Sequence, residues 1–234
     1  MPDYTNELGQ PIGQALPNWQ PSTVPPRSRM HGRLVNLEPI DLDLHCADLF
    51  GAFALDTDGR NWTYLPHGPF TDIDAFGTWM AATCFGDDPL FHTIVDASSG
   101  RAVGFASFQR IEPHVGSIEV GYINFSPALQ RTPLATEAMF LMMRRAFDEL
   151  GYRRYEWKCD AHNAASQAAA RRLGFTYEGT FRQAIIYKGR TRDTTWFSIT
   201  DVEWQARKTE FERWLDPANF DTDGTQRTRL RHSS

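Results

Sequence analysis

The order of β-type and helical segments is the feature that most constrains the fold of this chain. Three runs rich in β-branched and aromatic residues follow one another at 90–95, 102–111 and 117–125. Turn-forming residues separate them, Ser99-Gly100 in the first gap and 113–116 in the second. Such runs with turn signals between them predict an antiparallel meander of three strands.

A long helix is predicted directly after this meander, beginning near Thr132 and ended by Gly151. Its apolar residues recur every three or four positions: Ala135, Ala138, Met139, Met142, Ala146 and Leu150. The remaining segments are a strand at 155–159, a helix at 163–173, strand runs at 175–178 and 182–187, a Lys188-Gly189 turn and a strand at 193–200. Together they predict an α/β (α+β) fold, a mixed, mostly antiparallel sheet flanked by helices.

A single domain is expected over residues 31–216, between two irregular ends. Residues 1–30 hold six prolines, which predicts an irregular arm that Ile12 and Trp19 could pin to the body. The domain opens with a strand at 33–40, a helix from 42 capped by Asp41, and a short helix at 72–84. A charged helix at 202–215 precedes a polar tail, 217–234, that is expected to be loose.

Charge and cysteine content exclude several function classes. The formal net charge is −5, so no basic field exists to attract nucleic acid or an anionic membrane. Cys46, Cys84 and Cys159 lie far apart and form no CxxC pair, which is typical of a reduced, intracellular chain. The histidines show no metal-ligand spacing, and no signal peptide or membrane span is visible. A cytoplasmic protein without a metal is expected.

Two helix starts carry the candidate chemistry. The strand ending at Phe125 leads through a short loop to the helix at Thr132, and a helix start offers free amides and partial positive charge to a phosphate. Arg131 adds a charged donor, and Thr132 and Thr136 add hydroxyls. The alternative is an ordinary strand–loop–helix turn. At the second helix, Asn163 and Ser166 lie in the first turn, where a purely structural capping role is the ordinary alternative.

These segments resemble the GNAT superfamily of N-acetyltransferases, and specifically its RimJ/RimL-like branch. The resemblance rests on Glu119-Val-Gly-Tyr, the 130–138 run, Asn163-Ala-Ala-Ser and Leu173-Gly-Phe. The later 189–193 run and Phe197-Ser-Ile are similar to the closing hairpin of that branch. The similarity covers residues 33–204.

The resemblance implies a sheet splayed between its fourth and fifth strands, with acetyl-CoA in the opening. Ser166 is then expected to protonate the departing CoA thiolate. Asn163 and Ser166 are expected to contact the cofactor, together with strand backbone groups and the following loop and helix start: Ile123, Asn124, Phe125, Gln130, Arg131, Thr132, Leu134, Ala135 and Thr136.

Two positions depart from the family pattern. Pro133 stands where the pyrophosphate signature has a glycine, so one amide donor is missing. Ile185 stands where RimL-like enzymes place a glutamate. Glu119 is therefore the first candidate for the general base, acting directly or through a water, and Asp193 is a weaker one.

The acceptor side of the opening is predicted at the aromatic loop 61–70. Trp62, Tyr64, His67 and Phe70 are the candidate wall, with a satellite hydrophobic cluster as the alternative. The predicted function is acetyl transfer from acetyl-CoA to a primary amine, either a protein N-terminus or a small molecule, by direct attack. A catalytically weak acyl-CoA-binding sensor is the alternative, motivated by Pro133 and Ile185. A homodimer is left open as the assembly.

Overall fold

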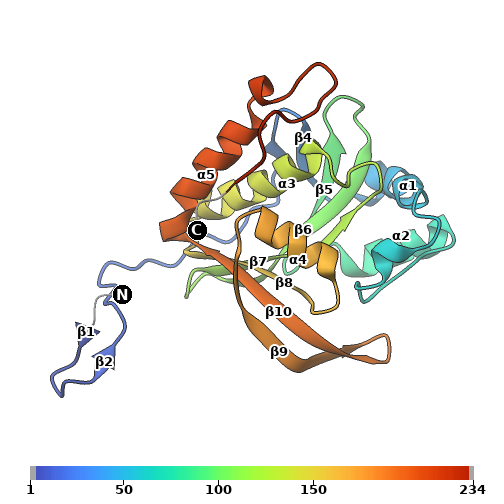
Figure 1. The fold of residues 1–234 in the computed structure, drawn as a ribbon. Helices are drawn as coiled ribbons and strands as arrows, with labels where there is room; N and C mark the ends of the chain where they lie inside the picture. The colour runs from blue at the N-terminus through green and yellow to red at the C-terminus, as the bar shows by residue number, and fades with distance from the viewer. Residues whose placement is uncertain (1–3, 232–234) are drawn as a thin grey trace.

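A computed structural model describes residues 4–231; residues 1–3 of the predicted arm and 232–234 of the predicted tail lie outside the described part. One sheet holds eight strands in the order β3-β4-β5-β6-β7-β8-β10-β9 (Figure 1). All neighbours are antiparallel except β7 and β8, which confirms the predicted fold class. The strands are β3 (Met30–His31), β4 (Val35–Pro39), β5 (Leu90–Asp96), β6 (Ala102–Glu112), β7 (Ser117–Phe125), β8 (Arg154–Asp160), β9 (Thr176–Tyr187) and β10 (Arg190–Thr200).

The helices begin at capping residues that the sequence makes recognisable. Asp41 and Asp72 accept hydrogen bonds from Leu44 and Ala75 amides, at 2.9 and 2.8 Å, as expected of N-caps. The helices are α1 (Leu42–Phe53), η1 (Arg60–Trp62), α2 (Ile73–Thr83), α3 (Pro133–Arg144), its π-helical continuation η2 (Arg145–Glu149), α4 (Ala164–Arg172), α5 (Asp201–Leu215) and η3 (Pro217–Asn219). None of the helices within 4–231 is long and apolar enough to cross a membrane.

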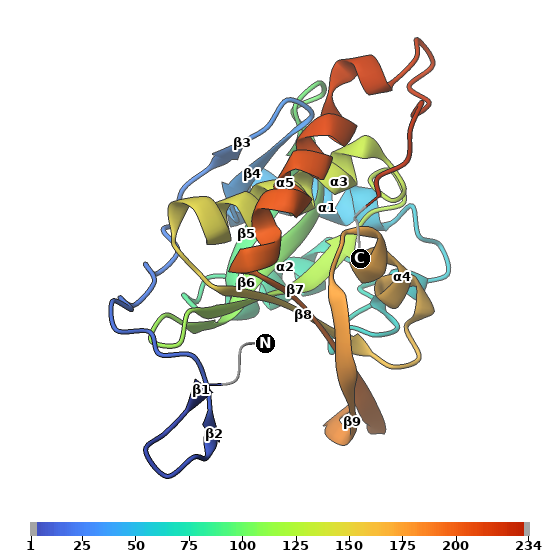
Figure 2. The same ribbon diagram turned by 60° about the vertical axis from the view of Figure 1, so that its left-hand side comes forward.

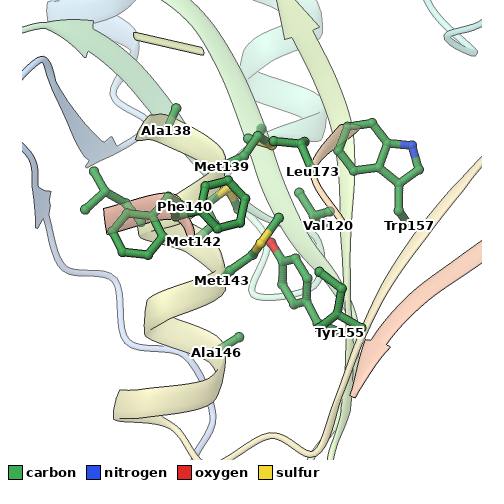
Figure 3. Packing of buried hydrophobic residues seen from close by; sticks show 14 of the residues in the cluster. Val120, Ala138, Met139, Phe140, Met142, Met143, Ala146, Tyr155, Trp157 and Leu173 are labelled. Atoms are coloured by element: carbon green, nitrogen blue, oxygen red, sulfur yellow. The ribbon is translucent and has the colours of Figure 1, made fainter. Parts of the chain in front are cut away.

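Two apolar clusters cover the two faces of the sheet. Because side chains alternate along a strand, Phe105 joins the cluster under α1 and α2, whereas Ala106 joins the larger cluster under α3 and α5. In the larger cluster, Met139 and Met143 of α3 lie over Tyr155 of β8 and Val120 of β7 (Figure 3). This packing fixes α3, and therefore its N-terminus, against the two strands that bound the site.

A buried carboxylate attaches the first strands to α3. Glu137 is 5% exposed, and its two oxygens accept hydrogen bonds from the amides of Arg33, Leu34 and Val35 at 3.1, 2.6 and 2.8 Å. A side chain at Gly32 would collide with this carboxylate, because a Cβ there lies 2.5 Å from Glu137 Oε2. The turn between β3 and β4 is thereby held over the helix.

Both chain ends are more ordered than expected. The arm contains a small separate hairpin of β1 (Tyr4–Thr5) and β2 (Pro11–Ile12), which extends away from the body (Figures 1 and 2). Trp19 does pin the arm, donating from Nε1 to the His114 carbonyl at 2.9 Å, but Ile12 is 51% exposed and pins nothing. The expectation of a loose tail was wrong over the described residues, since Asn219 bonds the Trp214 and Thr228 carbonyls and Leu230 is buried.

The sheet opens between β7 and β8, the fourth and fifth strands that the sequence predicts. Their parallel pairing runs only from Ser117 to Val120 on β7 and from Arg154 to Trp157 on β8. Beyond these positions the two strands continue without pairing to each other. Tyr122 adopts a positive φ of 47° where the register of β7 against β6 shifts, so a bulge accompanies the opening.

Candidate active site

A cavity of about 740 Å³ passes through the opening between β7 and β8. Its walls come from the open ends of these strands, the start of α4, the 61–66 loop and the β9–β10 hairpin. The hairpin is held to that loop, because Lys188 Nζ donates to the Trp62 carbonyl at 2.7 Å. Figure 1 shows the hairpin projecting from the sheet edge below α4.

Glu119 lines this cavity and is 2% exposed. Its Oε1 accepts from the Gln109 amide at 2.6 Å, and its Oε2 pairs with Arg110 Nη1 at 2.6 Å and Lys158 Nζ at 2.8 Å. Both carboxylate oxygens are therefore already hydrogen-bonded. A proton reaching Glu119 directly would have to displace one of these contacts, so relay through a water suits this geometry better.

Lys158 is one of the site residues that the sequence analysis missed. Its side chain is 6% exposed, pairs with Glu156 Oε2 at 2.7 Å as well as with Glu119, and lies 3.7 Å from the centre of the Trp196 ring. The pKa of Glu156 is lowered: burial acts to raise it, but hydrogen bonds from Lys158 and Arg154 outweigh burial. A signal was present, because charged Glu156, Lys158 and Asp160 alternate along the predicted strand with apolar neighbours.

Ser166 lies across the opening from Glu119, in the first turn of α4. Asn163 caps this helix by accepting from the Ser166 amide at 3.0 Å, so the structural role considered for Asn163 is present, and Asn163 also lines the cavity. Trp157 Nε1 donates to Ser166 Oγ at 3.0 Å, and the Ser166 side chain also hydrogen-bonds the Cys159 sulfur, so donation to another acceptor would exchange that contact. Burial raises the pKa of the neighbouring Cys159 thiol, which keeps it protonated and a poor nucleophile.

The start of α3 offers fewer amides than a family member with glycine at 133. Pro133 occupies the first helical position, where proline is well tolerated but donates nothing. Thr132 caps the helix by accepting from the Ala135 amide at 3.3 Å. Arg131 is exposed, with φ 61°, beside this terminus. The Leu134 amide thus remains the least committed donor there.

Two side chains near this helix start already have protein partners. Gln130 Nε2 donates to Asn61 Oδ1 at 2.8 Å and to the Phe125 carbonyl at 2.9 Å. Thr136 Oγ1 accepts from Arg172 Nη1 at 3.0 Å. Arg172, which was not predicted, therefore brings a second positive charge from α4 to the start of α3, where an anion would bind.

The open part of β7 contributes main-chain groups. Ile123 lines the cavity, and Asn124 is 2% exposed with a side-chain nitrogen that has no hydrogen-bond partner within residues 4–231. The Phe125 carbonyl is occupied by the Asn61 and Gln130 amides. Of these three residues Ile123 lines the cavity, whereas Asn124 pairs with Phe105 of β6 and, like Phe125, does not line it.

The aromatic loop divides between the cavity and the core. Tyr64 lines the cavity and donates to the His162 carbonyl at 3.1 Å. Trp62 and Phe70 pack edge to face at 5.3 Å within the cluster under α1 and α2, and neither lines the cavity. His67 packs on Trp79 at 5.5 Å. The satellite-cluster alternative therefore describes Trp62, His67 and Phe70, whereas Tyr64 alone of this group reaches the opening.

Asp193 and Ile185 lie on the hairpin. The Asp193 carboxylate accepts from the Gln183 amide at 2.7 Å, where β9 bulges with φ 50°, and it does not line the cavity. This contact gives Asp193 a structural part in the hairpin. Ile185 does line the cavity, so the position that carries a glutamate in RimL-like enzymes faces the site here with an apolar side chain.

Comparisons with known proteins agree with this geometry. The family model described as the acetyltransferase (GNAT) domain matches residues 35–176. The chain belongs to the GNAT family. A GCN5-related N-acetyltransferase structure from Brucella melitensis is 44% identical, with a TM-score of 0.90, covering 92% of this chain and 97% of that one. A probable GNAT acetyltransferase from Chromobacterium violaceum is 48% identical, with a TM-score of 0.78 and coverages of 84% and 98%.

More distant relatives agree with the RimJ/RimL-like branch. The N-acetyltransferase YnaD of Bacillus subtilis is 23% identical over 67% of this chain and 90% of its own length. YdaF of the same organism, provisionally named a ribosomal N-acetyltransferase, is 26% identical over 47% of this chain and 59% of its own.

As a GNAT member, the protein is an acetyl-CoA-dependent acyltransferase. The residues present fit that substrate, because β7 is not paired with β8 beyond Val120 and because Arg131 and Arg172 bring positive charge to the start of α3, which suits an anion. No group of three His, Cys, Asp or Glu side chains within 4–231 is arranged to hold a metal ion.

Proposed function

We propose that this GNAT protein transfers the acetyl group of acetyl-CoA to a primary amine by direct attack, without a covalent acyl-enzyme. The observation that supports this most is the placement of Glu119 and Ser166 around one cavity that runs between β7 and β8. A proton acceptor and a proton donor are needed at two different atoms in such a reaction. The raised pKa of Cys159 argues against a cysteine nucleophile.

Each residue then has a defined task. Acetyl-CoA supplies the acyl group. The open β7 segment around Ile123 and Asn124 orients the reacting carbonyl and offers main-chain donors to its oxygen. Glu119 receives the proton of the amine through a water, because its own oxygens are hydrogen-bonded to Gln109, Arg110 and Lys158. Ser166 donates its hydroxyl proton to the leaving sulfur, while Trp157 holds its oxygen.

Ser166→Ala is expected to lower the single-turnover rate of acetyl transfer by about 10²-fold, the ordinary contribution of an acid catalyst. Single-turnover quench measurements isolate the chemical step from product release. Ser99→Ala removes a hydroxyl from an exposed turn and should leave the rate unchanged. A Ser166→Ala rate within twofold of wild type would remove Ser166 from the mechanism.

The proposed function is tested by CoA release from acetyl-CoA with a panel of small amines and peptides bearing free N-termini, alongside thermal unfolding. Acetyl-CoA should raise the unfolding temperature, because a ligand that binds only the folded state stabilises it. Amine-dependent CoA release should accompany that shift. A shift without release from any amine would favour the acyl-CoA sensor, which Pro133 and the apolar Ile185 support. The homodimer stays a proposal that sedimentation would test.

A further inference from the structure

Three residues of β10 that line the cavity each carry a buried polar atom without a hydrogen-bond partner within residues 4–231. Arg192 Nε, Thr194 Oγ1 and Trp196 Nε1 are shielded from solvent, and none has a hydrogen-bond partner within residues 4–231. All three residues line the cavity, and Thr194 is only 7% exposed. Arg192 Nε and Trp196 Nε1 can only donate, and the Thr194 hydroxyl can donate as well as accept, so an acceptor on a ligand could satisfy each of them. Other buried polar atoms, such as His92 Nδ1 and the Tyr155 hydroxyl, are also unpartnered within residues 4–231, but these three lie on one strand that lines the cavity, and this grouping points to a ligand.

Strand register explains why these groups form one surface. Alternate residues of a strand share a face, so 192, 194 and 196 project to one side while Phe197 and Ile199 project into the core under α3. Thr194 pairs with Asp160 and Trp196 with Lys158, the residues of β8 at the opening. The donors therefore lie about one strand spacing, ~5 Å, from the open edge of β8.

The acidic groups of the cavity already have partners. Glu119 is bound by Gln109, Arg110 and Lys158. Asp88 accepts from the amides of Arg110 and Ile111 at 2.9 and 3.0 Å. The oxygens of both carboxylates therefore already accept hydrogen bonds from the protein, and neither carboxylate depends on a donor from a ligand.

Asp160, the carboxylate nearest to the β10 wall, is also engaged. It accepts from the Tyr187 hydroxyl at 2.9 Å and from the His162 amide at 2.8 Å. Burial acts to raise its pKa, but these hydrogen bonds and the charge of Arg192 outweigh burial and lower the pKa of Asp160. The unpartnered polar atoms of this wall can thus all act as donors, and they include Nε of Arg192, whose charge also acts on Asp160.

We propose that the β10 wall binds a carboxylate of the acceptor, so that the preferred amine carries a carboxylate within a few bonds of its nitrogen. This inference rests on the proposed function and names its substrate class. Arg192 supplies charge, and Thr194 and Trp196 supply directed donors, a set that suits a carboxylate. A carboxylate at this wall places the nearby amine at the opening, beside the proton acceptor Glu119.

The test compares each common α-amino acid as the free acid and as its carboxamide. The two forms differ in charge and in one acceptor while the amine is retained. For the best acceptor, kcat/KM for the acid is expected to exceed that for the amide by about 10- to 100-fold, the value of one or two charge-assisted hydrogen bonds. Peptides with the same first residue should behave like the amide. Equal values for acid and amide would overturn the proposal.

Arg192→Gln is expected to reduce the acid-to-amide ratio to within about threefold of one. Arg190→Gln is the matched control, because Arg190 lies on the same strand, is exposed and does not line the cavity. An acid-to-amide ratio that Arg192→Gln leaves at the wild-type value would contradict the assignment. Thermal unfolding of both variants shows whether each is folded.

Binding separates this inference from the proposed function. With CoA present, the N-acetylated amino acid should raise the unfolding temperature more than its carboxamide does, and Arg192→Gln should abolish the difference. This readout needs no turnover, so it stands even if no amine is acetylated. Equal protection by the two products would overturn the carboxylate subsite while leaving acetyl transfer intact.

Discussion

Glu119→Gln is expected to lower the single-turnover rate of acetyl transfer by about 10²- to 10³-fold, within the range of general base catalysis. The substitution removes the proposed proton acceptor and also leaves Arg110 and Lys158 without their shared anion. Glu112→Gln is the matched control, because Glu112 is an exposed carboxylate at the end of β6 and should leave the rate unchanged.

A double variant separates these two causes. Lys158→Met removes one of the two cations that Glu119 binds and leaves Glu156 paired with Arg154. If Glu119 accepts the proton, Glu119→Gln/Lys158→Met stays as slow as Glu119→Gln. If the double variant instead reaches the rate of Lys158→Met alone, Glu119 serves only to neutralise Lys158. Such a double-mutant cycle measures the coupling between the two residues.

Glu137→Ala is expected to lower the free energy of unfolding by about 3 to 4 kcal/mol, because three main-chain amides lose their acceptor. Glu137 is 5% exposed and accepts from Arg33, Leu34 and Val35, so water reaches these groups poorly. Urea unfolding measures the change. Glu137→Gln should fall between wild type and Glu137→Ala, because the amide keeps one acceptor oxygen.

Glu212→Ala provides the comparison for this loss. Glu212 lies exposed on α5, where a substitution is expected to alter stability by no more than about 0.5 kcal/mol. If Glu137→Ala costs no more than Glu212→Ala, the carboxylate does not hold the β3–β4 turn and the turn is fixed by packing alone.

Much of the fold was predictable because its signals are local. Asp41 and Asn163 were recognisable as caps, since each short polar side chain accepts from an amide three residues later. The Lys188-Gly189 turn was predicted between two strand runs, and both residues adopt the positive φ that a two-residue hairpin turn requires, at 48° and 69°. The helix α3 was predicted from its periodicity, but residues 136–143 are all buried, so its burial is not confined to the predicted face. The loose tail was mispredicted because composition carries no record of the contacts made by Asn219.

The candidate site was predictable only in part. Motifs placed Glu119 and Ser166 near one opening, and both line the same cavity. Tyr64 lies at the cavity, whereas Trp62 and Phe70 lie in the core. The sequence could not separate them, because all three are aromatic residues of one short loop. The alternation of charged and apolar residues around Lys158 indicated that its side chain shares a face with Glu156. Its contact with Glu119 could not be predicted, because the two residues lie on strands far apart in the sequence.

The sequence by itself determined the strand and helix order, the caps, and the family to which the chain belongs, because these depend on residues within a few positions of one another. Only the tertiary structure decided which polar groups meet in the opening and which are left unpartnered there. Whether Arg192, Thr194 and Trp196 face a cavity or a neighbour depends on the register of β10 against β8 and on where β7 and β8 part. Register and separation are set by packing of the whole sheet against α3, which no local pattern records.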